Sequence, residues 1–133
     1  MDSVDSRILG LLRENSRASN VELAKRLGLS EGAVRKRVEN LVSEKTIAKF
    51  TIITGAGAGG IVAIKCDIKT PTQEVVKKLK ALGASMVSEV SGEYDVICHV
   101  DTNGMEELNS VIEKIRTMPG VMEAKLFTVL KQD

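Results

Sequence analysis

Apolar residues recur every three to four positions over the first 44 residues, which is the spacing of amphipathic helices. The pattern predicts three helices, over residues 3 to 13, 19 to 27 and 30 to 44. The side chains predicted to face their common core are Val4, Ile8, Leu11, Leu12, Val21, Leu23, Ala24, Leu27, Val34, Val38, Leu41 and Val42. A weaker alternation over residues 50 to 54 predicts one strand after these helices.

Capping residues mark the ends of the second and third predicted helices. Ser19 caps the start of the second helix, and Glu22 lies three residues after Ser19, as in a capping box. Gly28 is suited to end that helix, and Ser30 to begin the next. Two short helices joined by residues 27 to 30 predict a helix-turn-helix of the winged type, whose second helix enters the major groove of DNA.

The outward face of the third predicted helix carries residues suited to DNA. Arg35 and Lys36 lie on its first two turns, where an arginine can bond guanine and a lysine can neutralise a phosphate. The candidate DNA-binding residues are Ser30, Glu31, Gly32, Arg35, Lys36 and Arg37. A three-helix bundle with a solvated basic face stays open as the alternative, because Glu31 and Glu39 are interspersed.

A run of small residues, 55 to 60, divides the sequence and is interpreted as a hinge. A glycine-rich loop can also hold phosphate, but that requires a helix directly after it, and an apolar strand follows here. The chain therefore divides into a helix-turn-helix domain (1–50), a strand with a hinge (51–60) and a second domain (61–133).

The second domain alternates strands and helices. The apolar pattern predicts strands over residues 61–69, 86–90, 95–101 and 121–130, with helices over 72–82 and 104–118. The order βαββαβ is typical of a ferredoxin-like sandwich, in which both helices cover one face of the sheet. The fold class is therefore α+β.

The other face of this sheet has no helix left to cover it. Its predicted residues are Ile61, Ala63, Lys65, Asp67, Val87, Glu89, Ile97, His99, Asp101, Phe127 and Val129, whereas Val62, Ile64, Cys66 and Ile68 are predicted to face the helices. A bare, half-apolar face indicates a second copy of the domain. We interpret His99 as an interface residue, not a catalyst.

Composition narrows the function classes. Residues 1–50 hold ten basic and seven acidic side chains, and residues 61–133 hold nine and eleven, so the first half is the one that favours nucleic acid. No long apolar run or signal peptide is present, which predicts a cytoplasmic protein with no membrane partner. Cys66 and Cys98 are expected as reduced buried thiols. Neither a zinc site, a cofactor nor a catalytic constellation is indicated, so we expect no enzyme.

The sequence resembles the Lrp/AsnC family of leucine-responsive, or feast/famine, transcription regulators. The segments that carry the resemblance are VDSRIL (4–9), NSRAS (15–19), ELAKRLGLS (22–30), VRKRVENL (34–41), GEYD (92–95) and MPGV (118–121). The resemblance implies a DNA-binding dimer that assembles further, often to octamers, and binds amino acids between effector domains. One departure is visible: Lys45-Thr46-Ile47 stands where the family usually has a glycine after the third helix.

Two loops at the ends of the third predicted strand are candidates for an effector site. The candidate residues are Gly92, Tyr94, Asp95, Asp101, Thr102 and Asn103. Backbone N–H groups near the glycines could bind the carboxylate of an amino acid, and Asp101 could bind its ammonium group. The alternative is that these residues serve only a turn and a helix cap.

The preferred hypothesis is a transcription regulator that binds a near-palindromic double-stranded operator as a homodimer or octamer and responds to an amino acid. One alternative is a ferredoxin-like small-molecule module whose helices mediate protein contacts. Another is an architectural protein that binds DNA without sequence preference. A steep salt dependence of DNA binding would exclude the first alternative, and discrimination between specific and random DNA would exclude the second.

Overall fold

The computed structural model describes residues 1–55 and 57–132 of the chain. It divides into two compact units, one formed by Met1–Ile53 and the other beginning at Thr54. Each unit has its own hydrophobic core, and each is described by itself.

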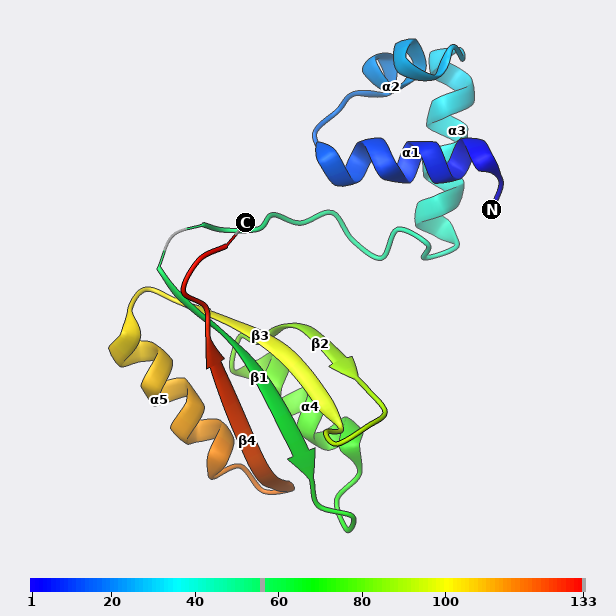
Figure 1. The fold of residues 1–133 in the computed structure, drawn as a ribbon. Coiled ribbons are helices and arrows are strands. Elements are labelled where there is room, and N and C mark those ends of the chain that lie inside the picture. The colour runs from blue at the N-terminus through cyan, green and yellow to red at the C-terminus, as the bar shows by residue number, and fades with distance from the viewer. Residues whose placement is uncertain (56, 133) are drawn as a thin grey trace. The chain divides into compact units, whose positions relative to one another are not determined.

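The first unit contains three helices, α1 (Ser3–Glu14), α2 (Asn20–Leu27) and α3 (Glu31–Ser43), and confirms the predicted helix-turn-helix (Figure 1). Their core is small and aliphatic, and its buried side chains are Ile8, Leu12, Leu23, Ala24, Val34 and Leu41. Two predicted core residues are wrong, because Val21 is 51% exposed and Val42 is 44% exposed. Both lie at the edge of an apolar stripe that is narrower than the sequence pattern indicates.

The caps predicted for α2 and α3 set the helix boundaries. The Ser19 hydroxyl accepts a hydrogen bond from the N–H of Glu22 at 3.1 Å, and that of Ser30 accepts one from Ala33 at 3.2 Å. Gly28 takes a left-handed conformation (φ 68°) that ends α2, which a side chain would disfavour. These local bonds fix where α3 begins.

The path out of α3 retains the geometry that a glycine would give. Lys45 has φ 61°, so a lysine occupies the left-handed position where the family usually has glycine. The N–H of Ile47 then bonds the carbonyl of Leu41 at 3.0 Å. The departure therefore leaves the turn in place and adds backbone strain at Lys45.

The strand predicted over residues 50 to 54 is wrong, because the segment has no regular secondary structure. Phe50, Ile52 and Ile53 are 53%, 80% and 82% exposed. A strand needs a hydrogen-bonding neighbour, and the described part of this chain supplies none to the segment.

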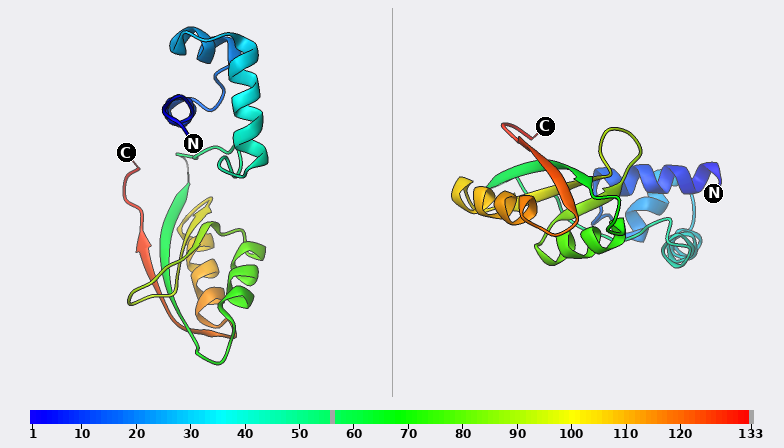
Figure 2. Two further views of the ribbon diagram at one scale, coloured as in Figure 1. Left: turned by 90° about the vertical axis from the view of Figure 1, so that its right-hand side faces the viewer. Right: turned by 90° about the horizontal axis from the view of Figure 1, so that it is seen from below.

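The second unit is an α+β sandwich of the predicted βαββαβ order. Its elements are β1 (Ala58–Cys66), α4 (Thr72–Ala81), β2 (Ser85–Glu89), β3 (Val96–Thr102), α5 (Met105–Arg116) and β4 (Val121–Thr128). The antiparallel sheet has the strand order β2-β3-β1-β4, and both helices lie on one of its faces (Figures 1 and 2). The ferredoxin-like prediction is confirmed.

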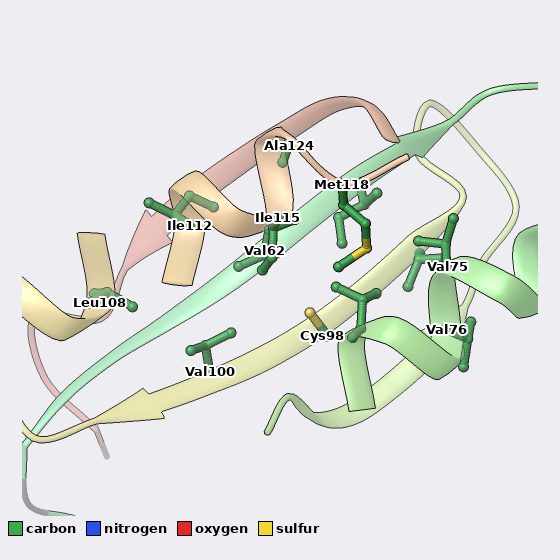
Figure 3. Close-up of a cluster of buried hydrophobic side chains, with 13 residues drawn as sticks. Val62, Val75, Val76, Cys98, Val100, Leu108, Ile112, Ile115, Met118 and Ala124 are labelled. Carbon is green, nitrogen blue, oxygen red and sulfur yellow. The ribbon is translucent and has the colours of Figure 1, made fainter. Parts of the chain in front are cut away.

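The core of this unit fills the space between the sheet and the two helices (Figure 3). Its buried side chains are Val62, Ile64, Val75, Val76, Leu79, Val96, Cys98, Val100, Leu108, Ile112, Ile115, Met118 and Ala124. Both cysteines are free thiols. Burial raises the pKa of Cys98 to about 11, and burial and the Asp95 carboxylate raise that of Cys66, so both thiols stay protonated at neutral pH.

The hinge interpretation of residues 55 to 60 is wrong for its last three residues, because β1 begins at Ala58. The glycines permit close packing there. A Cβ on Gly60 would lie 2.5 Å from Cδ1 of Leu126, and one on Gly57 would overlap the Thr102 carbonyl oxygen. Ala56 lies outside the described residues. The glycines therefore let β1 approach its neighbours.

Four assignments to sheet faces are also wrong. β2 has a register shift between Ser85 and Ser88, with Met86 at φ 47°, which turns Val87 toward the core and Glu89 toward Gln73 of α4. Ile68 lies beyond the end of β1 and is 98% exposed, and Asp67 also follows the strand. The register shift in β2 and the end of β1 at Cys66 account for these differences from the predicted faces.

Candidate functional site

The exposed face of α3 is the candidate DNA interface. Arg35 and Lys36 lie one turn after the start of the helix, and both are exposed. Val34 and Leu41 on the opposite side of α3 are buried in the core. The basic pair therefore projects away from the first unit.

The guanidinium of Arg35 is held on the surface of α3 by Glu31. Nη1 donates to both carboxylate oxygens of Glu31, at 3.0 and 3.2 Å. The side chains are 57% and 39% exposed, so water screens the pair. Spacing of four residues on a helix is the sequence signal that could have indicated this pair.

Arg37 is placed differently from Arg35 and Lys36. Its Nη1 donates to Asp2 at 2.7 Å and to Asp5 at 3.2 Å, so it connects α3 to the start of α1. The hydrogen bond from Arg37 holds the pKa of Asp2 below its usual value, and those to Asp2 and Asp5 raise the pKa of Arg37. The structure brings Arg37 into the fold of the first unit.

The first turn of α3 contributes small groups to the same face. The Ser30 hydroxyl oxygen caps the helix and keeps its own proton available for donation. A Cβ on Gly32 would lie 3.7 Å from Nη2 of Arg35, so the guanidinium lies back across this turn.

Asp95, one of the six candidate effector residues, serves the fold. Its Oδ2 accepts a hydrogen bond from the N–H of Cys66 at 2.7 Å, and its own N–H donates to the Ile64 carbonyl at 2.9 Å. These bonds connect the turn before β3 to the end of β1. Gly92 in that turn has φ 141°, a conformation suited to glycine, and Tyr94 is half-buried.

The candidate residues at the other end of β3 are more open. Asp101 is exposed and pairs with Gly59 across the strands. The Thr102 hydroxyl lies 2.9 Å from the Ala58 carbonyl oxygen, and the N–H of Asn103 donates to Glu107 at 2.9 Å. Thr102 and Asn103 therefore stabilise the loop between β3 and α5, and the side chain of Asp101 lies exposed at the surface.

One chain does not bring the two effector loops together. Asp95 precedes β3 and Asp101 lies near its end, and six residues of strand span about 20 Å. An amino acid cannot contact both loops of the same chain at once.

The sheet face without helices is the third candidate surface, called the outer sheet face here. Its residues are Ile61, Ala63, Lys65, Ile97, His99, Asp101, Glu123, Lys125 and Phe127. His99 and Phe127 flank Ile61 in the neighbouring strands, and Ile97 and Lys125 flank Ala63. The ammonium of Lys125 lies 5.9 Å from the ring centroid of Phe127, which is 52% exposed. The face is apolar at its centre.

No sequence pattern predicts the groove of about 610 Å³ in the first unit. Residues near the end of α1 and residues 46–53 line it, including Leu12, Arg13 and Phe50.

The described residues contain no group of three histidine, cysteine, aspartate or glutamate side chains placed to hold a metal. None of the described helices is long and apolar enough to cross a membrane.

Comparisons with known proteins agree with both units. Residues 1–42 match the AsnC-type helix-turn-helix domain, and residues 60–132 match the Lrp/AsnC ligand binding domain. These domains define a DNA-binding transcription regulator that responds to a small molecule. The chain belongs to the Lrp/AsnC family.

Whole-chain relatives support this assignment. The chain is similar to the HTH-type transcriptional regulator LysM of Sulfurisphaera tokodaii, with 36% identity over 98% of this chain and 96% of the relative. Among solved structures, Escherichia coli AsnC is 25% identical with a TM-score of 0.72, over 99% and 93% of the two chains. The Mycobacterium tuberculosis leucine response regulatory protein LrpA shares the fold, with a TM-score of 0.78 at 24% identity over 99% and 94%.

Proposed function

We propose that α3 reads a DNA operator through Arg35 and Lys36. The observation that carries the proposal is their exposure on the first two turns of the second helix of a helix-turn-helix. Arg35 would bond a guanine edge and Lys36 a phosphate. Ser30, Glu31 and Gly32 form the turn beside the DNA, where the small Gly32 allows close approach.

Arg37 is left out of the proposed contact set. Its guanidinium bonds Asp2 and Asp5 through Nη1, and these two ion pairs connect α3 to the start of α1. We assign it the role of holding α1 against α3.

DNA binding as a function of salt tests the proposal. A duplex selected by the wild-type chain from a random pool and a shuffled duplex of equal composition serve as probes. Arg35→Ala should weaken binding to the selected duplex by roughly 1–3 kcal/mol, and Lys36→Ala should weaken both duplexes alike. Arg7→Ala, which removes an exposed arginine of α1, is the matched control. Unchanged affinity in both α3 variants would contradict the proposal, and equal wild-type affinity for both duplexes would indicate an architectural protein.

The functional unit proposed here is a homodimer joined through the outer sheet face, which can assemble further to an octamer. Its half-buried Ile61, Ile97 and His99 lie on a face that neither α4 nor α5 covers. A two-fold dimer carries two copies of α3, so the operator would be a near-palindrome with half-sites one or more helical turns apart.

An amino acid is the proposed effector, with the exposed Asp101 as the group that binds its ammonium. The loop of Gly92 and Tyr94 from another copy would complete the site, because the two loops of one chain lie too far apart. Thr102 and Asn103 would hold the Asp101 loop, as Asp95 holds the other. We place this regulator, which is not an enzyme, in the cytoplasm.

Thermal shift against the twenty amino acids, followed by calorimetry, tests the effector proposal. A ligand that binds only the folded state raises the Tm. Asp101→Ala should abolish heat of binding for the amino acid that does so. No binding at millimolar concentration, or unchanged affinity in Asp101→Ala, would contradict this assignment.

A further inference from the structure

The ion pair on α3 leaves one particular edge of Arg35 available. Both bonds to Glu31 come from Nη1, and no other described residue bonds Nε or Nη2. Nε and Nη2 form one of the two bidentate edges of a guanidinium. The free edge can therefore donate to both O6 and N7 of one guanine.

Gly32 is part of the same arrangement. Nη2 of Arg35 lies 3.7 Å from the position that a Cβ on Gly32 would occupy, so the guanidinium lies along the helix surface over the first turn. The first turn is the part of a recognition helix that contacts bases. The pair therefore holds the free edge beside the part of α3 that faces the groove.

We propose that Glu31 is a positioning residue that presents the Nε–Nη2 edge of Arg35 to a guanine and thereby raises sequence specificity. This inference rests on the proposed contact between α3 and DNA. An arginine side chain loses rotational freedom when it binds, and a side chain already held in place loses less. The Glu31 carboxylate also repels phosphates, which weakens binding to any sequence. Repulsion acts on both duplexes alike and leaves the ratio of operator affinity to random affinity unchanged, whereas the positioning of Arg35 raises that ratio.

A purely structural role for Glu31 makes a different prediction. An acidic residue in the first turn stabilises a helix through its dipole, with no effect on sequence discrimination. Glu31→Asp separates the two roles, because aspartate keeps the charge at the helix start but is too short to retain the pair with Arg35.

The experiment measures affinity for the wild-type-selected duplex and the shuffled duplex, together with the Tm of each variant. Glu31→Gln and Glu31→Asp should each lower the ratio of the two affinities about three- to tenfold, the range for one immobilised side chain. The control is Glu39→Gln, which removes the same charge from an exposed site on α3 that forms no ion pair with any described residue, and it should leave the ratio unchanged.

The same substitutions in an Arg35→Ala background complete the test. There, Glu31→Gln should change the ratio no more than Glu39→Gln does. A wild-type ratio in both Glu31 variants overturns the inference, as does an effect that persists without Arg35. If Arg35→Ala itself leaves the ratio unchanged, the proposed DNA contact is wrong, which is a distinguishable failure.

Discussion

The exposed face of α3 and the outer sheet face are built in different ways. The first comes from one short stretch of chain, and the side chains that define it are charged. The second comes from strands far apart in the sequence, and its centre is apolar. The difference indicates that the two surfaces bind different partners, because a charged helix face is suited to DNA and an apolar sheet face to a second copy of the chain.

The largest expected effect follows from placing a charge on the outer sheet face. Ile97→Asp should raise the dissociation constant of the dimer at least about a hundredfold, because each interface would bury two unpaired carboxylates. Sedimentation velocity at micromolar concentration measures the change. The matched control is Ile68→Asp, at a residue that is 98% exposed beyond β1, and it should leave the dimer intact. Equal behaviour of the two variants would exclude this face as the interface.

A glycine substitution tests whether the start of β1 is packed or is a hinge. Gly57→Ala should destabilise the second unit by roughly 1–3 kcal/mol, because a side chain there overlaps the Thr102 carbonyl and φ is 91°. Gly55→Ala, which meets nothing within 4 Å, should cost much less. Urea unfolding followed by circular dichroism compares them, and equal stabilities would restore the hinge interpretation.

A substitution to glycine in the turn after α3 should stabilise the protein, in contrast to the loss expected for Gly57→Ala. Lys45→Gly should stabilise the first unit by about 0.5–1 kcal/mol, because glycine adopts the left-handed conformation of this residue without strain. Thermal unfolding measures the gain. A loss of stability would show that the flexibility glycine gives the unfolded chain outweighs the relief of strain.

The smallest effect concerns Arg37, which connects α3 to the start of α1. Arg37→Ala should lower the Tm slightly at neutral pH, where exposed ion pairs contribute little. The pKa of Asp2 is lowered in the folded state, so its contribution is present above the usual aspartate pKa of about 3.9 and is lost as the pH falls below it. The difference in Tm between wild type and variant should therefore shrink below pH 4. A difference independent of pH would exclude the ion pair as its cause.

Local signals predicted the first unit well. Ser19, Gly28 and Ser30 act within one helical turn, so their caps are readable from sequence. The outward position of Arg35 and Lys36 on α3 is readable in the same way, from the spacing of the apolar residues. The partners of Arg37 lie 32 and 35 residues away, and no local pattern indicates them.

The features of the second unit that could not be predicted from the sequence depend on contacts between residues far apart in the chain. The element order followed from periodicity, but the bulge at Met86 depends on how β2 meets β3. Gly59 and Gly60 were interpreted as a hinge because sequence alone does not show which strands approach them. The bond from the N–H of Cys66 to Asp95 joins residues 29 positions apart, and no local pattern indicates it.

In the proposed dimer, two chains joined through the outer sheet face bring two copies of α3 to one operator. The most direct test compares the wild-type-selected duplex with a copy in which one half-site is scrambled, using wild type and Ile97→Asp. Wild type should prefer the intact duplex about a hundredfold or more, because the second half-site is bound at high effective concentration, and Ile97→Asp should lose that preference. Equal wild-type affinity for both duplexes, or a preference that survives in Ile97→Asp, would contradict the claim.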